Sequence, residues 1–304
     1  MSCRLGAPVS RSLSVIIPVY NRPAELDRAL ASLTVQTRMP GEVIIVDDGS
    51  PIDLLPVVGR YNSKLNLRFL RTENFGGPGR PRNVGARAAS GEWLSFLDCD
   101  DWWYPGRIAA VEASMDGEVG AYYHRLECVR EDSSGAVGKH FVGQAFSGEL
   151  WRQVLTRGNP VPNSSAVVRK DIYLAVGGMS EERRMISVED VDCWIKLSKL
   201  GVVFRFIDST LGAYWVGTDG ISRTARRQLV AQRALYRSHG RVLTGRLARD
   251  ARSFHAYVMG THCARSGRYR RRARAYFRIA AAGMPSLIRA KALIKYLQTV
   301  ARIS

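Results

Sequence analysis

Three carboxylates stand close together in the stretch FLDCDD, residues 96 to 101, at the end of the apolar run WLSFL. Asp98 and Asp100 are separated by one residue, and Asp101 follows at once. Carboxylate oxygens are hard ligands that hold Mg²⁺ or Mn²⁺ while leaving positions open for phosphate oxygens. Asp101 is also placed to cap a helix running through PGRIAAVEASM. The stretch alone is therefore consistent with a metal site or with a helix cap.

A second acidic pair, Asp47 and Asp48 in VDDGS, closes an earlier apolar run. A carboxylate in this position can accept hydrogen bonds from a base or from ribose hydroxyls. The competing interpretation is an ordinary Asp-Gly turn. If neighbouring strands hold both acidic ends side by side, the edge of the sheet carries a carboxylate cluster that attracts a cation.

The segment ENFGGPGRPRN, residues 73 to 83, combines glycines with arginines. Glycines let backbone N–H groups approach phosphate, and Arg80 and Arg82 offer fork-shaped donors. The segment is not a dinucleotide fingerprint, because Arg82 occupies the third glycine position, and the chain has no GK[ST] of a P-loop. By itself it could equally be a flexible surface turn.

A last acidic motif lies in SVEDVDCWIKL, residues 187 to 197. Ser187 and Asp190 stand at capping-box spacing, which predicts a helix start. A carboxylate at a helix N-terminus can also serve as a general base. Asp192 and Lys196, four residues apart, are interpreted as a surface ion pair.

The elements that must position these groups alternate between strands and helices. LSVIIPVY is followed by a helix with Asn21 as its cap and Pro23 in its first turn, then by EVIIV, LRFLR, a helix at 80 to 89 and WLSFL. This order predicts an α/β fold with a mainly parallel, Rossmann-like sheet and flanking helices. Ligands of such sheets bind at the carboxyl ends of the strands. The acidic residues of VDDGS and FLDCDD are expected there, whereas those of SVEDVDCWIKL are expected at a helix start.

The net charge of +18 is concentrated at the C-terminal end of the chain. Residues 221 to 304 hold 20 Lys and Arg with a single acid, Asp250, whereas residues 1 to 220 hold 25 bases and 26 acids. We therefore expect a domain at residues 1 to 224 and a basic helical C-terminal extension at residues 225 to 304, with Pro285 starting the last helix. Polycationic amphipathic helices favour anionic lipid surfaces, and the alternative is a solvated tail or one that packs on an acidic partner.

Composition also limits where the protein works. The five cysteines are scattered and show no CxxC spacing, which favours a reducing compartment. Neither a signal peptide nor a run of about 18 apolar residues is present. We expect a cytoplasmic protein that associates peripherally with the inner face of the membrane.

Taken together, VIIPVYNR, VIIVDDGS, the stretch from NFGGPGRPRN to FLDCDDWW, and VEDVDCWIKLSKLG resemble family 2 glycosyltransferases with the GT-A fold. The resemblance covers roughly residues 12 to 224. It implies an inverting, metal-dependent transfer of a sugar from a nucleotide-diphosphate sugar to an acceptor hydroxyl. The acceptor would be a glycan or a lipid-linked glycan, in the synthesis of cell-surface polysaccharide or glycolipid.

The resemblance also implies a role for individual residues. Asp98 and Asp100 would hold Mg²⁺ or Mn²⁺, and Asp190, paired with Glu189, would be the catalytic base. The donor nucleotide would be bound by Pro18, Tyr20, Arg22, Asp47, Asp48, Arg82 and Asp98. The family's ARN is PRN here, and Cys99 replaces a common serine. The segment YWVGTDGISR, residues 214 to 223, would close over the donor, with Trp215 where an arginine is expected.

Two other functions are consistent with parts of the sequence. A sugar nucleotidyltransferase shares the nucleotide-binding layout, but its glycine-rich loop after the first strand is replaced here by PVYNR. A non-catalytic nucleic-acid-binding protein could use the arginine-rich extension. That function leaves the acidic strand ends unexplained, so no nucleic-acid partner is expected.

Overall fold

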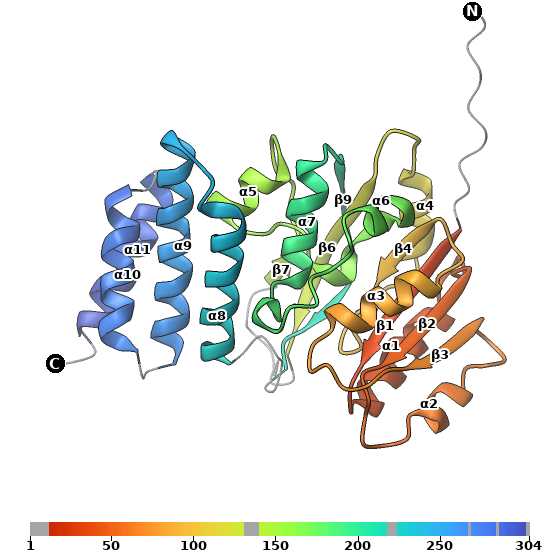
Figure 1. Ribbon diagram of the computed structural model, residues 1–304. Helices are drawn as coiled ribbons and strands as arrows, with labels where there is room; N and C mark the ends of the chain where they lie inside the picture. The colour runs from red at the N-terminus through yellow and green to blue at the C-terminus, as the bar shows by residue number, and fades with distance from the viewer. Residues whose placement is uncertain (1–11, 131–139, 218–223, 267–268, 284–285, 302–304) are drawn as a thin grey trace, which may run out of the picture. The chain divides into compact units, whose positions relative to one another are not determined.

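The computed structural model describes residues 12–130, 140–217, 224–266, 269–283 and 286–301 (Figure 1). These residues form two compact units. The first takes the described parts of Met1–Ala145, Pro160–Met179 and Leu197–Gly217, and the second takes those of Phe146–Asn159, Ser180–Lys196 and Thr218–Ser304. The units reflect packing, whereas the boundary expected at residue 224 rests on charge and stays a prediction.

Four parallel strands form the first part of the sheet, in the spatial order β3-β2-β1-β4. They are β1 (Leu13–Val19), β2 (Glu42–Asp47), β3 (Leu67–Arg71) and β4 (Trp93–Phe96). Every residue of β1, β2 and β4 is buried, as continuous apolar strands covered on both faces must be. The register pairs Val19 with Asp47 and Ile16 with Phe96, so the acidic segments after β2 and β4 leave the same edge of the sheet.

The second part of the sheet is mixed. It contains β8 (Val167–Arg169), β6 (Ala121–Val129), β9 (Phe204–Trp215), β5 (Trp102–Trp103) and β7 (His140–Val142). β8 runs antiparallel to β4, and β6 runs antiparallel to β8, whereas β9 is parallel to β6. The predicted α/β fold is therefore confirmed, with a parallel first half and a mixed second half.

The helices of the first unit are α1 (Pro23–Thr34), α2 (Leu55–Gly59), α3 (Gly79–Ala88), α4 (Arg107–Ser114) and α6 (Lys170–Ala175), with a 3₁₀ turn η1 (Asn163–Ser165). The cap of α1 is Arg22 and not the predicted Asn21. Asn21 instead adopts a left-handed conformation, with φ of +54°, and donates its backbone N–H to Ser50 Oγ at 2.8 Å. The cap of α4 is Gly106, so Asp101 does not cap that helix either.

Helices build the second unit. They are α5 (Leu150–Arg157), a 3₁₀ turn η2 (Arg183–Met185), α7 (Glu189–Lys199) up to Lys196, α8 (Ala225–Leu235), a π-helical turn η4 (Tyr236–Gly240), α9 (Gly245–Arg265), α10 (Arg270–Gly283) and α11 (Ser286–Ala301). The C-terminal helical extension is thus confirmed, while Pro285 lies outside the described residues. None of the helices in the described part of the chain is long and apolar enough to cross a membrane.

Helices α9, α10 and α11 pack side by side (Figure 1). Met259 and Cys263 of α9 meet the buried Phe277 of α10, and Ala280 of α10 meets Ala292 of α11. Gly260 lets α10 approach, since a Cβ on Gly260 would lie 2.7 Å from the Phe277 ring. Small residues therefore set the spacing of these helices.

A glycine also sets how closely α3, the helix that carries Arg82, lies on the sheet. A Cβ on Gly85 would lie 2.6 Å from Ile16 Cγ2 and 3.3 Å from Val46 Cγ2. We predict that Gly85→Ala lowers the free energy of unfolding by about 1–3 kcal/mol through overpacking. Urea denaturation followed by tryptophan fluorescence measures this loss.

The matched control is Gly59→Ala at the end of α2, where an added Cβ meets nothing within 4 Å. We expect no loss of stability there, and a gain of up to about 1 kcal/mol from helix propensity. Equal losses for the two variants would contradict the packing role of Gly85.

Candidate active site

The carboxylates of Asp47 and Asp48 at the end of β2 are both committed to backbone groups. Asp47 is fully buried and accepts the Ser50 N–H at 2.9 Å, while Arg71 Nη1 lies 3.4 Å from its other oxygen. Asp48 accepts the N–H of Phe75 at 3.0 Å and that of Gly76 at 2.9 Å. Asp47 therefore orders the turn after β2, and Asp48 holds the glycine-rich segment beside it.

Asp98 is held by two side chains that come from different elements. Arg82 Nη2 of α3 lies 2.5 Å from Asp98 Oδ1, and Asn163 Nδ2 of η1 donates to the same oxygen at 3.0 Å. The Arg82 side chain is only 4% exposed. A charge-assisted hydrogen bond that involves a buried guanidinium is strong.

Arg82 is itself positioned by its neighbour Asn83. Asn83 donates to the Met179 carbonyl at 2.8 Å, and its oxygen accepts bonds from Tyr173 Oη at 2.6 Å and from the Met179 N–H at 3.0 Å. This buried amide locks α3 in rotation, so Arg82 faces Asp98.

Asp100 carries an incompletely compensated charge. Arg22 Nη1 lies 3.4 Å from Asp100 Oδ2 and 3.5 Å from Glu25 Oε1. Burial, reinforced by the nearby charge of Asp98, raises the pKa of Asp100 to about 6. Two neighbouring carboxylates that favour a cation fit the oxygen-ligand chemistry of Mg²⁺ or Mn²⁺.

The two carboxylates would not enclose a cation by themselves. Among the described residues, no group of three or more His, Cys, Asp or Glu side chains converges on one point. A bound cation would take its remaining oxygens from water or from a ligand, as Mg²⁺ does at sites that bind phosphate.

Asp101 has a structural role that differs from the expected helix cap. It is 1% exposed, its Oδ2 accepts from Ser164 Oγ at 2.5 Å, and its Oδ1 accepts the Trp215 N–H at 2.8 Å. Burial raises the pKa of Asp101 well above its usual range. Asp101 thus connects the acidic loop, residues 98 to 101, to η1 and to the end of β9.

The guanidinium of Arg28 in α1 packs against two indole rings, whose centres are 6.3 Å apart. It lies 4.5 Å from the ring centre of Trp102 and 4.7 Å from that of Trp215. Its Nη2 also donates to the backbone carbonyl of Asp100 at 2.7 Å. Arg28 therefore fixes the backbone of the acidic loop, and Trp215 makes the cation–π contact on the β9 side.

The remaining predicted donor residues lie at the end of β1 or just after it. Pro18 is buried in the strand and pairs with Val46 of β2, whereas Tyr20 is 48% exposed just past the strand. Arg22, two residues later, reaches Asp100. An exposed aromatic ring at the end of β1 is suited to contact a nucleoside.

Glu189 and Asp190 open α7 in the second unit. Glu189 is buried and accepts the Ser187 N–H at 2.7 Å. Ser187 Oγ is buried and has no hydrogen-bond partner among the described residues, so the predicted capping box between Ser187 and Asp190 is wrong. Asp190 is partly exposed in the first turn of α7.

The interpretation of Asp192 and Lys196 as a surface pair is also wrong. Asp192 is 2% exposed and bonds Lys196 Nζ at 2.6 Å and His239 Nε2 at 2.8 Å. His239 belongs to the π-helical turn η4. A buried polar bridge therefore joins the helix that carries Asp190 to the C-terminal extension.

Four positioning residues, Arg28, Asn163, Ser164 and His239, escaped the sequence analysis. Asn163 and Ser164 lie in a short 3₁₀ turn without periodicity, and Arg28 occupies an ordinary polar position of an amphipathic helix. Their partners lie 47 to 72 residues away in sequence. Only the fold brings Arg28, Asn163 and Ser164 to the segment Asp98 to Asp101, and His239 to Asp192.

The packing of Arg28 generates a stability prediction. Arg28→Ala removes two cation–π contacts and one hydrogen bond, and we expect it to lower the free energy of unfolding by about 2 kcal/mol. Arg60→Ala is the control, because Arg60 is 58% exposed and makes one ion pair, with Asp27 at 3.0 Å. Measured by urea denaturation, the free energy of unfolding should fall by less than about 1 kcal/mol in the control. An equal loss in the two variants would contradict the stabilising role of Arg28.

Comparison with known proteins places this arrangement in a family. The model described as "Glycosyl transferase family 2" matches residues 14–170. An uncharacterized glycosyltransferase of Haemophilus influenzae is 34% identical over 189 residues, which are 61% of this chain and 61% of that protein.

Two solved structures share the fold. The structure titled S. aureus TarS 1-349 in complex with UDP-GlcNAc has a TM-score of 0.54 at 18% identity and covers 95% of this chain and 90% of that one. Mannosyltransferase PcManGT from Pyrobaculum calidifontis, solved with GDP-Man and Mn²⁺, has a TM-score of 0.61 at 18% identity, covering 96% and 80%. With its fold and more than half of its length matched, the chain belongs to glycosyl transferase family 2.

Proposed function

We propose that this protein transfers a sugar from a nucleotide-diphosphate sugar to an acceptor hydroxyl, with inversion at the anomeric carbon and with the help of Mg²⁺ or Mn²⁺. The observation that carries the proposal is the pairing of Asp98 and Asp100 at the carboxyl edge of the parallel strands, each with an arginine partner. The donor classes UDP-sugar and GDP-sugar are suggested by the ligands of the two structures that share the fold.

The first unit would bind the donor. Tyr20 and Arg22 follow β1, Asp48 follows β2, and Arg82 stands beside Asp98. Asp98 and Asp100 would hold the cation, which would neutralise the leaving diphosphate. Arg82 and Arg22 keep the two carboxylates in place and add positive charge where the diphosphate is expected to lie.

Asp190 would act as the general base. A base must accept the proton of the acceptor hydroxyl as its oxygen attacks the anomeric carbon from the side opposite the diphosphate. Glu189 is buried and accepts the Ser187 N–H, whereas Asp190 is partly exposed to solvent and so to an acceptor, which makes Asp190 the better candidate of the pair. The bridge from Asp192 to Lys196 and His239 would keep α7, and with it Asp190, in one orientation.

The acceptor is proposed to be a glycan or a lipid-linked glycan in the synthesis of cell-surface polysaccharide or glycolipid. Relatives that match over shorter stretches are named poly(ribitol-phosphate) beta-N-acetylglucosaminyltransferase and hyaluronan synthase, both of which are named for polymer substrates or products. The matched stretches cover 16% and 9% of those proteins, so the acceptor of this chain is open to direct test.

The cation pair can be tested without knowing the acceptor. We expect UDP or GDP to raise the thermal stability in the presence of Mn²⁺, by an amount equivalent to about 2.7 kcal/mol at a ligand concentration of 100 Kd. Asp100→Ala should abolish the part of this stabilisation that depends on Mn²⁺. Asp208→Ala, a change at a 76% exposed carboxylate, should retain it. Nucleotide binding indifferent to both Mn²⁺ and Asp100→Ala would refute the cation pair.

The base is tested by separating binding from turnover. Asp190→Asn should keep the thermal shift with nucleotide and Mn²⁺ but lower transfer by about 10²–10⁴-fold, as removal of a general base does. Release of UDP from UDP-GlcNAc, or of GDP from GDP-mannose, is measured with soluble and lipid-linked glycan acceptors. Asp171→Asn, at a 62% exposed carboxylate, is the control, and undiminished transfer by Asp190→Asn would remove Asp190 as the base.

A further inference from the structure

Two adjoining hollows lie among the helices of the second unit, and they differ in chemistry. The first has a volume of about 270 Å³ and is lined by four arginines, Arg233, Arg237, Arg241 and Arg252, together with Tyr236 and His255. The second is a groove of about 710 Å³ between α10 and α11 with a mainly apolar lining. Ile279 of α10 lines both, so the two hollows share a wall.

The arginines of the first hollow are brought together by a local distortion of the chain. At η4 the helix widens, and the Arg241 N–H bonds the Tyr236 carbonyl at 3.1 Å, five residues back. Gly240 permits this turn, because a Cβ there would lie 2.4 Å from the Tyr236 ring. The ring of Tyr236 stacks on His255 of α9 with centroids 4.4 Å apart.

The positive charge of this hollow is not neutralised by the described residues. None of the four arginines forms an ion pair with a carboxylate in the part of the chain that the structure describes, and Arg233 bonds only the neutral Tyr276 hydroxyl, at 3.1 Å. Burial, followed by the charge of Arg233, lowers the pKa of His255 to about 4. Clustered guanidinium groups without a counter-charge are a site for a polyvalent anion such as phosphate.

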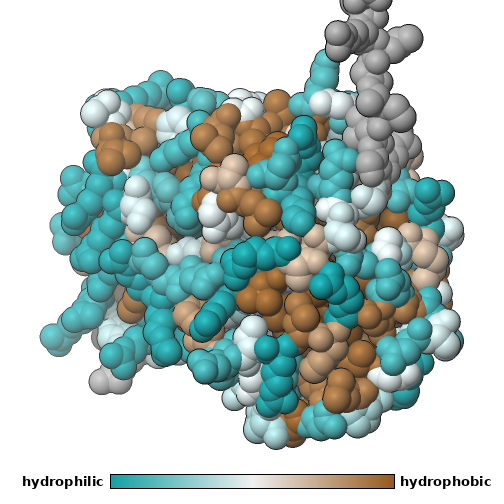
Figure 2. All heavy atoms as spheres, turned by 45° about the vertical axis from the view of Figure 1, so that its right-hand side comes forward, coloured by the Kyte–Doolittle hydropathy of each residue, from teal (hydrophilic) through white to brown (hydrophobic). Residues whose placement is uncertain are grey.

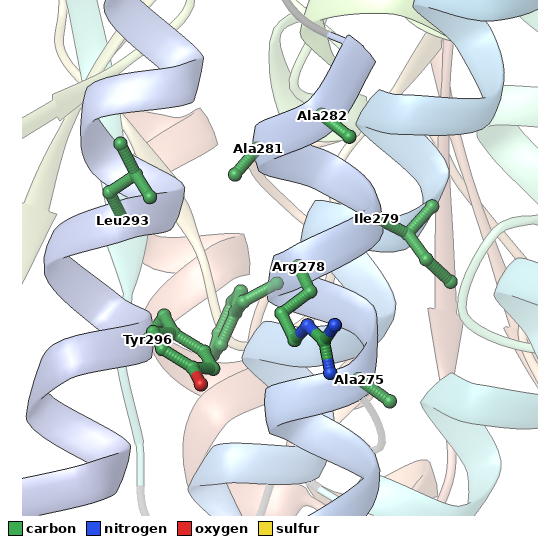
Figure 3. Close-up of a pocket in the computed structure, with 8 residues that line it drawn as sticks. Ala275, Arg278, Ile279, Ala281, Ala282, Leu293 and Tyr296 are labelled. Carbon is green, nitrogen blue, oxygen red and sulfur yellow. The ribbon is translucent and has the colours of Figure 1, made fainter.

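The groove offers the complementary apolar surface. Figure 3 shows Leu293 and Tyr296 of α11 across from Ala281 of α10, while Ala282 and Ile279 point to the other side of α10. Leu293, Ile294 and Leu297 are 45%, 54% and 62% exposed, so α11 presents a row of uncovered apolar side chains. Large exposed apolar side chains also occur elsewhere, and on the face seen in Figure 2 hydrophobic patches are surrounded by hydrophilic residues.

We propose that the two hollows together form a binding site for an anionic phospholipid of a membrane surface, with the phosphate head group among the four arginines and a hydrocarbon chain in the groove. Lipid binding was expected of residues 225 to 304 as a whole, and this proposal assigns it to one site within them. Residues 251 to 304 contain no Asp or Glu, so the surrounding chain favours an anionic surface as well.

The combination of the two hollows selects a lipid over other anionic partners. A nucleic acid would be attracted by the arginines, but it offers no hydrocarbon to cover Leu293 and Leu297. An interfacial helix, by contrast, buries its apolar side chains in the acyl boundary while its basic residues meet the head groups. The site does not depend on the proposed sugar transfer, because all its residues belong to the second unit.

Vesicle flotation of the full chain tests the site. We expect binding to phosphatidylcholine vesicles that contain phosphatidylglycerol and little binding to pure phosphatidylcholine. The double variant Arg237→Gln and Arg241→Gln should weaken binding by about tenfold or more, because each arginine near the surface contributes about 1 kcal/mol. Leu293→Gln should weaken it by about fivefold through lost insertion.

Matched variants control for general loss of charge or apolar surface. Arg246→Gln and Arg249→Gln together remove two charges of α9 that line neither hollow, and Leu200→Gln changes a 65% exposed leucine of the first unit. Both controls should float like the unaltered chain. Thermal unfolding, and the nucleotide shift with Mn²⁺, should be unchanged in every variant, which separates failure of this site from failure of the proposed transfer.

Several outcomes would overturn the proposal. Equal flotation of Leu293→Gln and the unaltered chain would exclude insertion into the groove. Release of the protein from vesicles by millimolar inorganic phosphate, but not by the same ionic strength of chloride, would show a free-phosphate site. Loss of binding to both vesicles and duplex DNA in the arginine variant, with Leu293→Gln harmless, would indicate a nucleic-acid surface.

Discussion

Repulsion among carboxylates at one edge of the sheet is the constraint on which the first unit depends. The parallel register brings the segments after β2 and β4 to the same edge, and Asp47, Asp48, Asp98, Asp100 and Asp101 would destabilise the fold without compensation. Hydrogen-bond donors compensate these charges in different ways. Asp48 accepts two backbone N–H groups, and Asp98 accepts bonds from Arg82 and Asn163. Asp101 accepts bonds from Ser164 and from the Trp215 N–H. Asp100 is met by Arg22 Nη1 at the longer distance of 3.4 Å, and burial, reinforced by the charge of Asp98, raises its pKa to about 6.

The groups that compensate these charges also join distant parts of the first unit. Arg82 requires α3 at a fixed rotation, which Asn83, Met179 and Tyr173 secure. Arg28 donates to the Asp100 carbonyl while its guanidinium packs against two tryptophans, one from β5 and one from β9. Trp215, which replaces an arginine expected from the family, therefore has a packing role in this chain. Residues 218–223, which follow it, lie outside the described residues.

The parts of the molecule governed by local pattern were predictable from the sequence. β-branched runs of the right length predicted β1 and β2, short apolar stretches predicted β3 and β4, and the acidic and arginine-containing segments that follow these strands form the candidate site. The caps were not predictable from residue type and spacing: the Asn21 backbone and the Asp101 carboxylate bond elsewhere, and Ser187 Oγ has no hydrogen-bond partner among the described residues. Long-range partners such as Asn163 for Asp98 and His239 for Asp192 carry no local signal, since sheet order and helix packing alone decide them.

The buried bridge between Asp192 and His239 has a consequence for how this protein can evolve. Helix α7 up to Lys196 belongs to the same compact unit as α8 to α11, although the charge of the sequence changes between them. A chimera joined at residue 224 would keep the strand-end carboxylates but leave Asp192 buried beside Lys196 alone, without the imidazole. The extension is therefore not an interchangeable module, and α7 and η4 should be inherited and exchanged together.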